Sequence, residues 1–373
     1  MLLDGNILKS DEKAVFSLRS LYRKYGYLRY KMSKFEEYDM YVRNKDFLIS
    51  DNMITFTDAN GKLLALKPDV TLSIIKNSGD SDGKLEKYYY NENVYRVAKG
   101  THSFKEIMQT GLECIGNIDV YNMCEVVMLA AESLRQVSES YVLDVSHMGI
   151  ISKLVDSLPC TGEIKSKIVR CIGEKNTHEI RSICRESGID EARTEKILLL
   201  VTTYGRADKV LEKLKKELSG DGVEEYLYEL EQVCAAAAEN DSTDKINIDF
   251  SIVNDMSYYS GIVFRGFIEG IASGILSGGR YDKLMSRMGK KSGAIGFAVY
   301  LDLLERFNES DTEYDVDTVL LYDDSSSADS VSKAVKEIVQ LGFSVVAERK
   351  IPEKLEYRRI LQLRNGGVVE IER

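Results

Sequence analysis

A change of pattern in the middle of this 373-residue chain constrains its fold more than any other feature. The stretch from about Gly162 to Asn240 is charged, repeats its apolar residues with the helical period and contains no run typical of a strand. Strand patterning precedes this stretch and resumes after it, first at Asn247–Val253 and then at Gly261–Ile268. This order predicts a mixed, mainly antiparallel sheet with helices, interrupted by an all-helical insertion.

The block before the insertion predicts two long helices and several strands. Ser10 is a candidate cap for a helix over Asp11–Gly26, because acidic residues suit its first turn and apolar residues recur along one side. Residues 58–61 read Asp-Ala-Asn-Gly, a hairpin signal between two short apolar runs. The predicted strands are Met53–Thr57, Leu63–Leu66, Lys87–Val97, Gly111–Gly116 and Tyr141–Ser146; a second helix covers Tyr121–Ser138, and 98–110 is a loop with part of a returning strand.

The block after the insertion adds strands and a closing helix before the texture changes again. A third returning strand is predicted at Ser273–Leu276 and a helix at Gly293–Phe307. From Val316 onward, strand and helix runs alternate and end in a pair of strands around residues 365–366. We therefore expect a core formed by residues 1–160 and 241–312, a helical insertion at 161–240 and a small α/β domain at 313–373.

Composition excludes some classes of protein and disfavours others. No apolar stretch approaches the length that spans a bilayer, and the first ten residues lack the basic region and apolar run of a secretory signal. Six cysteines stand far apart without a C-x-x-C pair, and three histidines show no metal-ligand spacing. We therefore expect free thiols in a reducing cytoplasm, no metal ion and no other cofactor. A net charge of -10 disfavours nucleic acid as a partner.

Four short segments, in chain order, carry a resemblance to a known family. They are Leu64–Thr71; Val94–Arg96 with Gln109–Glu113; Ser257–Phe264; and Ser277–Leu284 with Gly293–Leu304. They resemble, respectively, the L-x-L-R-P-E-x-T, F-R…Q-x-G-x-E, L-D-Y-Y-T-G-x-V-F and G-G-R-Y-D-x-L patterns of histidyl-tRNA synthetases, the last followed by motif 3. One such string is weak, but four in order at compatible spacings are specific. The resemblance implies an α+β fold with a class II aminoacyl-tRNA synthetase-like antiparallel sheet flanked by helices.

The resemblance also implies a pocket for a free amino acid. An ammonium group needs carboxylates, a carboxylate needs a cation or amides, and an imidazole needs aromatic walls with polar partners. By resemblance, four polar residues would fix the amino group and the ligand, Arg96 would face the carboxylate, two tyrosines would line the imidazole, and Glu113 could accept a ring N–H. The implied histidine-binding residues are Asp69, Thr71, Arg96, Gln109, Glu113, Tyr259 and Tyr281.

The alternative for these residues is an ordinary structural role. Tyr258 and Tyr259 are adjacent, so in a strand they would point to opposite faces and one of them would serve in packing. Arg96 and Glu113 also fall in predicted strands, where polar side chains usually face water. We favour ligand binding because the residue types complement one another.

The arginines that adenylation requires are the part of the family pattern that this chain lacks. Stabilising charge on a phosphorus centre calls for positioned arginines. Arg96 matches one of the family's three, whereas Asn254 and Leu303 stand at the positions of the other two. Tyr300 replaces a glycine of motif 3, and Ser33 stands where motif 1 has its proline. The resemblance therefore implies binding without adenylation and no catalytic residue.

Among relatives of histidyl-tRNA synthetase, the chain most resembles the regulatory subunit of ATP phosphoribosyltransferase, which shares its domain order and short tail. That family implies a non-catalytic allosteric subunit that supports a short catalytic subunit in the first step of histidine biosynthesis and relays feedback inhibition by histidine. It also implies a hetero-octamer, a homodimer through the synthetase-like core, no tRNA and no membrane. Histidine could bind in the pocket or at a subunit interface. A divergent amino-acid adenylating enzyme and a scaffold with a vestigial pocket are the two alternatives.

Overall fold

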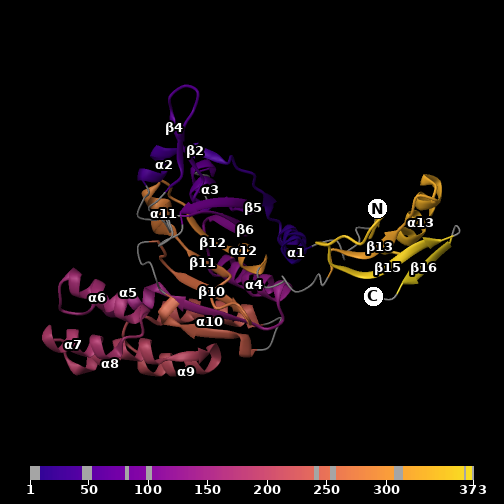
Figure 1. Ribbon diagram of the computed structural model, residues 1–373. Coiled ribbons are helices and arrows are strands. Elements are labelled where there is room, and N and C mark those ends of the chain that lie inside the picture. Colours follow the sequence, from indigo (N-terminus) through magenta and orange to yellow (C-terminus); the bar gives the residue numbers. More distant parts are fainter. Residues whose placement is uncertain are drawn as a thin grey trace. The chain divides into compact units, whose positions relative to one another are not determined.

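The computed structural model describes residues 9–43, 53–79, 84–97, 103–238, 243–252, 258–305, 314–364 and 367–371. The chain forms two compact units, residues 1–305 and residues 306–373. The larger unit combines helices with a large and mostly antiparallel sheet (Figure 1), so the predicted α+β class is confirmed. This unit contains all the residues that the sequence assigns to a binding site.

The described part of the larger unit is built on a sheet of nine strands. They are β1 Leu28–Arg29, β5 Glu86–Val97, β6 Phe104–Gly116, β7 Tyr141–His147, β8 Tyr204–Arg206, β9 Ile246–Asp249, β10 Ile262–Ile268, β11 Leu276–Arg280 and β12 Gly293–Tyr300. Their order is β1-β5-β6-β12-β11-β10-β7-β9-β8, and neighbours are antiparallel except in the pairs β1–β5 and β7–β9. The predicted mainly antiparallel sheet is thus confirmed, and strands from both sides of the insertion are neighbours within it.

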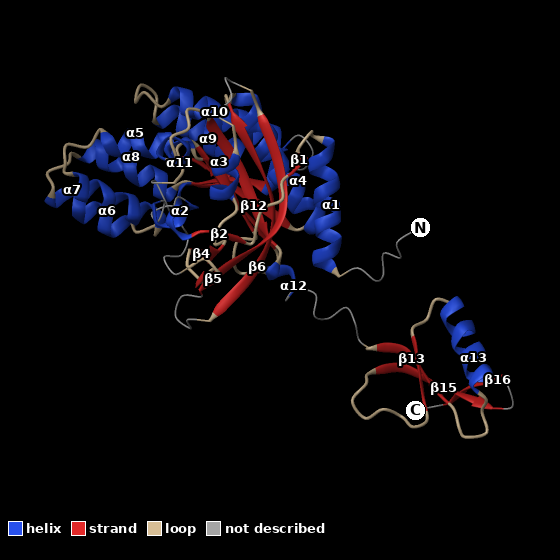
Figure 2. Cartoon of the chain, turned by 90° about the horizontal axis from the view of Figure 1, so that it is seen from above, coloured by secondary structure: helices blue, strands red, loops and turns tan. Residues whose placement is uncertain are grey.

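Two helices, α1 (Ser10–Lys24) and α4 (Val120–Val137), cover one face of this sheet (Figure 2). The Tyr22 hydroxyl of α1 lies 3.0 Å from the Ser133 hydroxyl of α4, which joins the two helices above the sheet. A Cβ at Gly266 of β10 would lie 2.6 Å from a leucine of α4, so the helix packs directly on the strand. Residues that alternate with Gly266 along β10 therefore point to the other face.

A smaller sheet precedes the third helix of the larger unit. It consists of β2 Phe35–Glu37, β3 Thr55–Thr57 and β4 Leu63–Leu66, in the order β2-β4-β3. The antiparallel pairing of β3 with β4 confirms the predicted hairpin. The helices around this sheet are α2 Tyr38–Arg43 and α3 Thr71–Asn77.

The insertion is mainly helical, but the prediction that it is all-helical is wrong. Tyr204–Arg206 forms the edge strand β8, which pairs antiparallel with β9. Three residues are too few to show a strand period, and their backbone groups are satisfied by the neighbouring strand. The helix α5 Met148–Asp156 precedes the insertion. The helices of the insertion are α6 Gly162–Gly173, α7 Thr177–Glu186, α8 Glu191–Thr202, α9 Ala207–Glu217 and α10 Glu224–Ala238. Two short 3-10 helices, η2 Thr243–Lys245 and η3 Phe250–Ile252, flank β9.

The predicted helix over Gly293–Phe307 is also wrong in its larger part. Residues Gly293–Tyr300 form β12, a central strand, and only Asp302–Glu305 is helical, as α12. A strand covered on both faces is apolar throughout, so it lacks the alternation that distinguishes a strand from a buried helix. The third returning strand likewise begins later than predicted, at Leu276 rather than Ser273. The short helix α11, Asp282–Arg287, lies between these strands in the chain.

The start of the first helix also differs slightly from the prediction. Ser10 is the first helical residue rather than the cap, and Lys9 occupies the cap position. The backbone N–H of Lys9 donates to a carboxylate oxygen of Glu12 at 3.0 Å. Acidic residues in this first turn suit the positive end of the helix dipole, as the sequence indicates.

The smaller unit has a sheet in the order β14-β13-β15-β16 and one described helix. Leu320, Ile338 and Leu361 belong to its own apolar cluster, which forms between the helix and the sheet. The elements are β13 Val316–Leu321, α13 Ala328–Gln340, β14 Val345–Glu348, β15 Tyr357–Arg364 and β16 Gly367–Ile371. The predicted alternation of strands and helix in the tail is therefore present.

Candidate functional site

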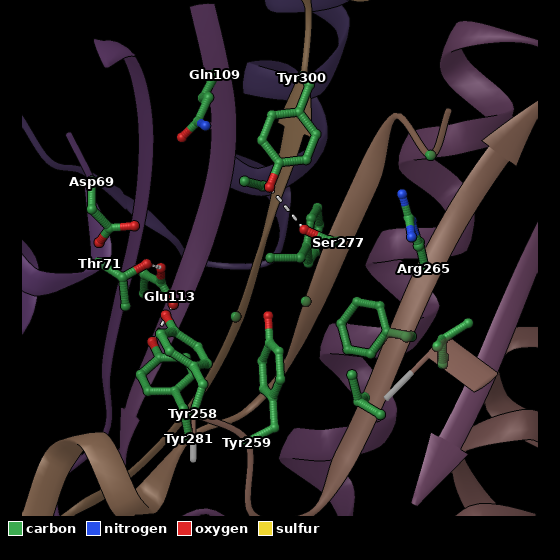
Figure 3. A pocket seen from close by; sticks show the side chains of 18 of the residues that line it. Asp69, Thr71, Gln109, Glu113, Tyr258, Tyr259, Arg265, Ser277, Tyr281 and Tyr300 are labelled. Atoms are coloured by element: carbon green, nitrogen blue, oxygen red, sulfur yellow. Dashed lines mark hydrogen bonds between the residues drawn. The ribbon is translucent and has the colours of Figure 1, made fainter. Parts of the chain in front are cut away.

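Figure 3 shows a cavity of about 680 Å³ beside the large sheet. It lies on the face away from α4, because Arg265, which lines it, alternates along β10 with Gly266, which packs against α4. Its walls come from β5, β6, β10, β11 and β12 and from the turn that leads into α3. All seven residues that the sequence assigns to ligand binding line this cavity: Asp69, Thr71, Arg96, Gln109, Glu113, Tyr259 and Tyr281. The structure therefore brings residues from four distant segments together, while what they bind stays a prediction.

Glu113 of β6 is a buried carboxyl group in the cavity wall, with 2% of its surface exposed. Its Oε1 accepts a hydrogen bond from the Thr71 hydroxyl at 2.7 Å, and its Oε2 accepts one from the Tyr281 hydroxyl. Burial raises the pKa of Glu113 to about 8, although both hydrogen bonds act in the opposite direction. The group is therefore mostly protonated at neutral pH, and a cation or N–H donor bound beside it would favour its ionised form.

Asp69 supplies a second acidic group, at the turn into α3. Its Oδ1 accepts a hydrogen bond from the backbone N–H of Leu72 at 2.9 Å, which fixes the carboxylate at the helix N-terminus. Burial raises the pKa of Asp69, while the Leu72 amide and the Arg96 guanidinium act against that rise. Arg96 of β5 donates from Nε to the Pro68 carbonyl at 3.0 Å. A carboxylate and a guanidinium thus lie near each other, as the two charges of an amino acid require.

Three tyrosines form an aromatic wall, one more than the sequence indicated. Tyr258 and Tyr259 both line the cavity, with ring centroids 4.6 Å apart and an edge-to-face arrangement. The Tyr258 ring also lies 5.8 Å from the Tyr281 ring. The expectation that one of the adjacent tyrosines points away is wrong, because this part of the chain is a turn and not a strand. Figure 3 shows the three rings side by side.

The far side of the cavity contains Ser277 and Arg265, which sequence reasoning did not assign to the site, and Tyr300, which it named only as the replacement of a motif 3 glycine. The Ser277 hydroxyl of β11 lies 2.9 Å from the Tyr300 hydroxyl at the end of β12. Tyr300 is paired in register with Gln109 of β6, which is buried and lies above Asp69 in Figure 3. Arg265 of β10 completes this side. The place of Ser277 in a family motif could have indicated that it lies in the cavity. No sequence signal marks Arg265 as a cavity residue.

The residues that, by resemblance, depart from the family motifs lie in different parts of the structure. Leu303 of α12 is partly buried and packs against the main apolar core, and it is not among the residues that line the cavity. Tyr300 does line the cavity, so its side chain occupies space there. Asn254 lies outside the described residues. Ser33 is exposed, and its hydroxyl accepts a hydrogen bond from the backbone N–H of Phe35 at 3.1 Å.

The histidine, cysteine and acidic side chains outside the cavity form no metal site in the described residues. Among the described ranges, no group of three or more histidine, cysteine, aspartate or glutamate side chains could hold a metal ion. All six cysteines lie in described residues and have free thiols. His147, a buried histidine at the start of α5, lies 2.8 Å from the Glu229 carboxylate, and its Nδ1 accepts from the Gly149 amide at 3.0 Å.

In the part of the chain that the structure describes, none of the helices combines the length and the apolar character needed to cross a membrane.

Comparisons with known proteins place the chain among characterised families. The family model described as histidyl-tRNA synthetase matches residues 7–304. An ATP phosphoribosyltransferase regulatory subunit from Caldanaerobacter subterraneus is 31% identical over 291 residues, 76% of this chain and 75% of the relative. A solved structure of an ATP phosphoribosyltransferase regulatory subunit/histidyl-tRNA synthetase from Bacillus halodurans aligns with a TM-score of 0.76 and 22% identity, over 95% of this chain and 93% of the other. An ATP phosphoribosyl transferase complex from Thermotoga maritima aligns with a TM-score of 0.63 and 21% identity, over 78% of this chain and 97% of the other.

Proposed function

The chain belongs to the ATP phosphoribosyltransferase regulatory subunits, within the wider histidyl-tRNA synthetase family, and from this premise we propose that it binds free histidine without activating it. Membership of this family gives it a regulatory role in histidine biosynthesis. The class II synthetase-like fold is shown by the same comparisons. The ligand, its site and the mechanism are the proposal.

One observation carries the proposal: the cavity joins the complementary groups that a free histidine needs. Asp69 and Glu113 offer acidic groups, Arg96 offers a cation and the tyrosines offer aromatic walls. Glu113 would accept an imidazole N–H, Tyr259 and Tyr281 would contact the ring, and Asp69, Thr71 and Gln109 would fix the amino group. A pocket of this type, apolar in its walls with a few convergent polar groups, is typical of small-molecule sites.

Loss of adenylation follows from the residues at the catalytic arginine positions. Leu303 cannot donate a hydrogen bond to phosphate, and Asn254 carries no charge. Removing one positioned group of this kind commonly costs about a hundredfold to a thousandfold in rate. Tyr300 adds bulk inside the cavity, which supports the same conclusion. The chain would therefore hold histidine and not consume it.

The partner in this proposal is a short-form ATP phosphoribosyltransferase catalytic subunit in the cytoplasm, joined in a hetero-octamer that contains homodimers of this chain. The likeness to the Thermotoga maritima complex supports an assembly of this kind. Histidine would bind one arrangement of the complex better and shift the population toward it. The free thiols support a reducing compartment. A net charge of -10 supports the absence of tRNA from the partners.

Calorimetric titration of the full chain with L-histidine tests the ligand. We expect saturable binding that Glu113→Gln weakens at least about tenfold, because a hydrogen bond to a charged group is lost. Glu353→Gln makes the same charge change at an exposed position of the smaller unit and should leave the affinity unchanged. Equal binding by wild type and Glu113→Gln would show that histidine binds elsewhere, such as at a subunit interface.

ATP–pyrophosphate exchange in the presence of histidine tests the absence of activation. The residues at positions 254 and 303 lead us to expect exchange at background level. Clear exchange by the purified chain would support the alternative of a divergent amino-acid adenylating enzyme. An active histidyl-tRNA synthetase assayed alongside is the positive control.

A further inference from the structure

We propose that the cavity contains a second subsite, at Arg265, for an anion of the phosphate or carboxylate type that binds beside the amino acid. The proposal deepens the proposed function and rests on it for the identity of the neighbouring ligand. The subsite itself is argued from the geometry of Arg265, Ser277 and Tyr300, so an anion alone can test it.

Two arginines line the cavity, and only Arg96 acts on the acidic residue Asp69. Asp69 and Glu113 lie on one side, and Figure 3 shows Arg265 on the other side, with Tyr259 and Ser277 between them. The volume of about 680 Å³ falls in the middle of the range of pockets that hold drug-sized ligands, roughly 300–1,000 Å³. A single free amino acid bound among the acidic groups would therefore leave the side near Arg265 unfilled.

Strand register fixes the surroundings of Arg265. On β10 it is paired with Ser277 of β11 on one side and with Asp144 of β7 on the other. Directly paired residues share a face of the sheet, so all three side chains point to the cavity face. Gly274 makes room for the guanidinium, because a Cβ there would lie 2.4 Å from the Arg265 Nε.

The two hydroxyl groups beside Arg265 retain one O–H donor that their mutual hydrogen bond does not use. Ser277 and Tyr300 lie 2.9 Å apart, and one of them donates to the other. Two hydroxyls carry two protons, so the second O–H is available to a ligand. Arg265 adds a guanidinium with up to five N–H donors in a planar fork. A cation with neighbouring hydroxyl donors is the arrangement that binds phosphate and carboxylate oxygens.

Asp144 limits the strength of this subsite. Burial raises the pKa of the Asp144 carboxyl group, and the positive charge of Arg265 acts against that rise. Asp144 is buried, and its Oδ1 accepts a hydrogen bond from the Asn247 amide at 3.4 Å. A bound anion would therefore share the guanidinium with a fixed negative charge. Removing that charge should strengthen anion binding.

The test is calorimetry of the full chain with inorganic phosphate and, separately, with acetate, each with and without saturating histidine. We expect saturable binding of one or both anions to the wild type. Arg265→Gln should weaken anion binding at least about tenfold more than it weakens histidine binding. Asp144→Asn should strengthen anion binding several-fold. Arg358→Gln, the same change at an exposed position of the smaller unit, should have no effect.

Several outcomes would overturn the subsite. These are the absence of saturable binding of both anions to the wild type, or anion binding by Arg265→Gln equal to that of the wild type. Equal weakening of histidine and anion binding in Arg265→Gln would show that Arg265 holds the carboxylate of histidine itself. Ser277→Ala, with thermal unfolding as the check of folding, repeats the test should Arg265→Gln not fold. Anion binding without histidine binding would contradict the proposed function and leave the subsite supported.

Discussion

At the scale of single residues, Glu113 shows how burial changes what a carboxyl group can do. It is 2% exposed and receives hydrogen bonds from two hydroxyls, yet desolvation dominates and raises its pKa to about 8. Its motif position in the sequence indicated that Glu113 faces a ligand. The sequence could not indicate the pKa, which depends on partners far away in the chain.

Histidine affinity should therefore depend on pH. A ligand N–H or ammonium group favours ionised Glu113, so binding releases a proton from a group with a pKa of about 8. We expect affinity to rise from about pH 6.5 to pH 8, approaching about tenfold per pH unit for one full proton. Calorimetry in two buffers of different ionisation enthalpy measures the number of protons released on binding. Glu113→Gln should show no release from this position, and a pH-independent wild-type affinity would contradict the assignment.

The stability of the folded chain should depend on pH in the opposite sense to the histidine affinity. The folded pKa of Glu113, about 8, lies above its ordinary value of 4.5, so the native state binds more protons between these values. The free energy of unfolding should then fall as pH rises through this window, by up to a few kcal/mol from this residue. Urea unfolding at pH 5.5 and pH 8.5 checks this. Glu113→Gln should lose part of the slope, whereas Glu353→Gln should retain all of it.

At the scale of elements, β12 marks the limit of what sequence patterns could predict. The hairpin at β3 and β4, the long strand β5 and the helix α4 were predicted, because each shows a clear period or turn signal. β12 was predicted as a helix, because a central strand is apolar on both faces. The seven residues chosen from the motifs line one cavity, and what they bind stays a prediction. The places of Arg265 and Tyr258 followed only from strand register and from a turn.

The glycine in the middle of β12 should be essential to the site. A Cβ at Gly296 would lie 1.8 Å from Oε2 of Glu113 and 2.4 Å from the Leu112 carbonyl, so alanine must displace the carboxyl group. We expect Gly296→Ala to lower the free energy of unfolding by about 1–3 kcal/mol and to abolish histidine binding. Gly162→Ala is the matched control, since nothing lies within 4 Å of its added Cβ. Normal binding by Gly296→Ala would contradict the geometry.

At the scale of the whole molecule, the two units have separate apolar cores. The clusters of the larger unit include Leu18, Val145 and Phe264, while that of the smaller unit centres on Leu320 and Ile338. The cavity residues all belong to residues 1–305. Removal of the smaller unit should therefore leave histidine binding intact. We propose that the domain boundary lies near residue 305 rather than residue 312.

A chain truncated after Glu305 tests this separation. We expect it to bind histidine within about twofold of the full chain, because each unit has its own core. Calorimetry gives the affinity and thermal unfolding gives the integrity of the truncated chain. A folded truncated chain that no longer binds histidine would show that the smaller unit contributes to the site.

The most direct test of the central claim is the histidine response of the assembled complex. The rate of the catalytic partner is measured at increasing histidine with wild-type or Glu113→Gln regulatory subunit, each relative to its own rate without histidine. The account predicts that Glu113→Gln raises the histidine concentration for half-inhibition at least about tenfold, because the cavity is the sensor. Identical inhibition curves for the two complexes would contradict it.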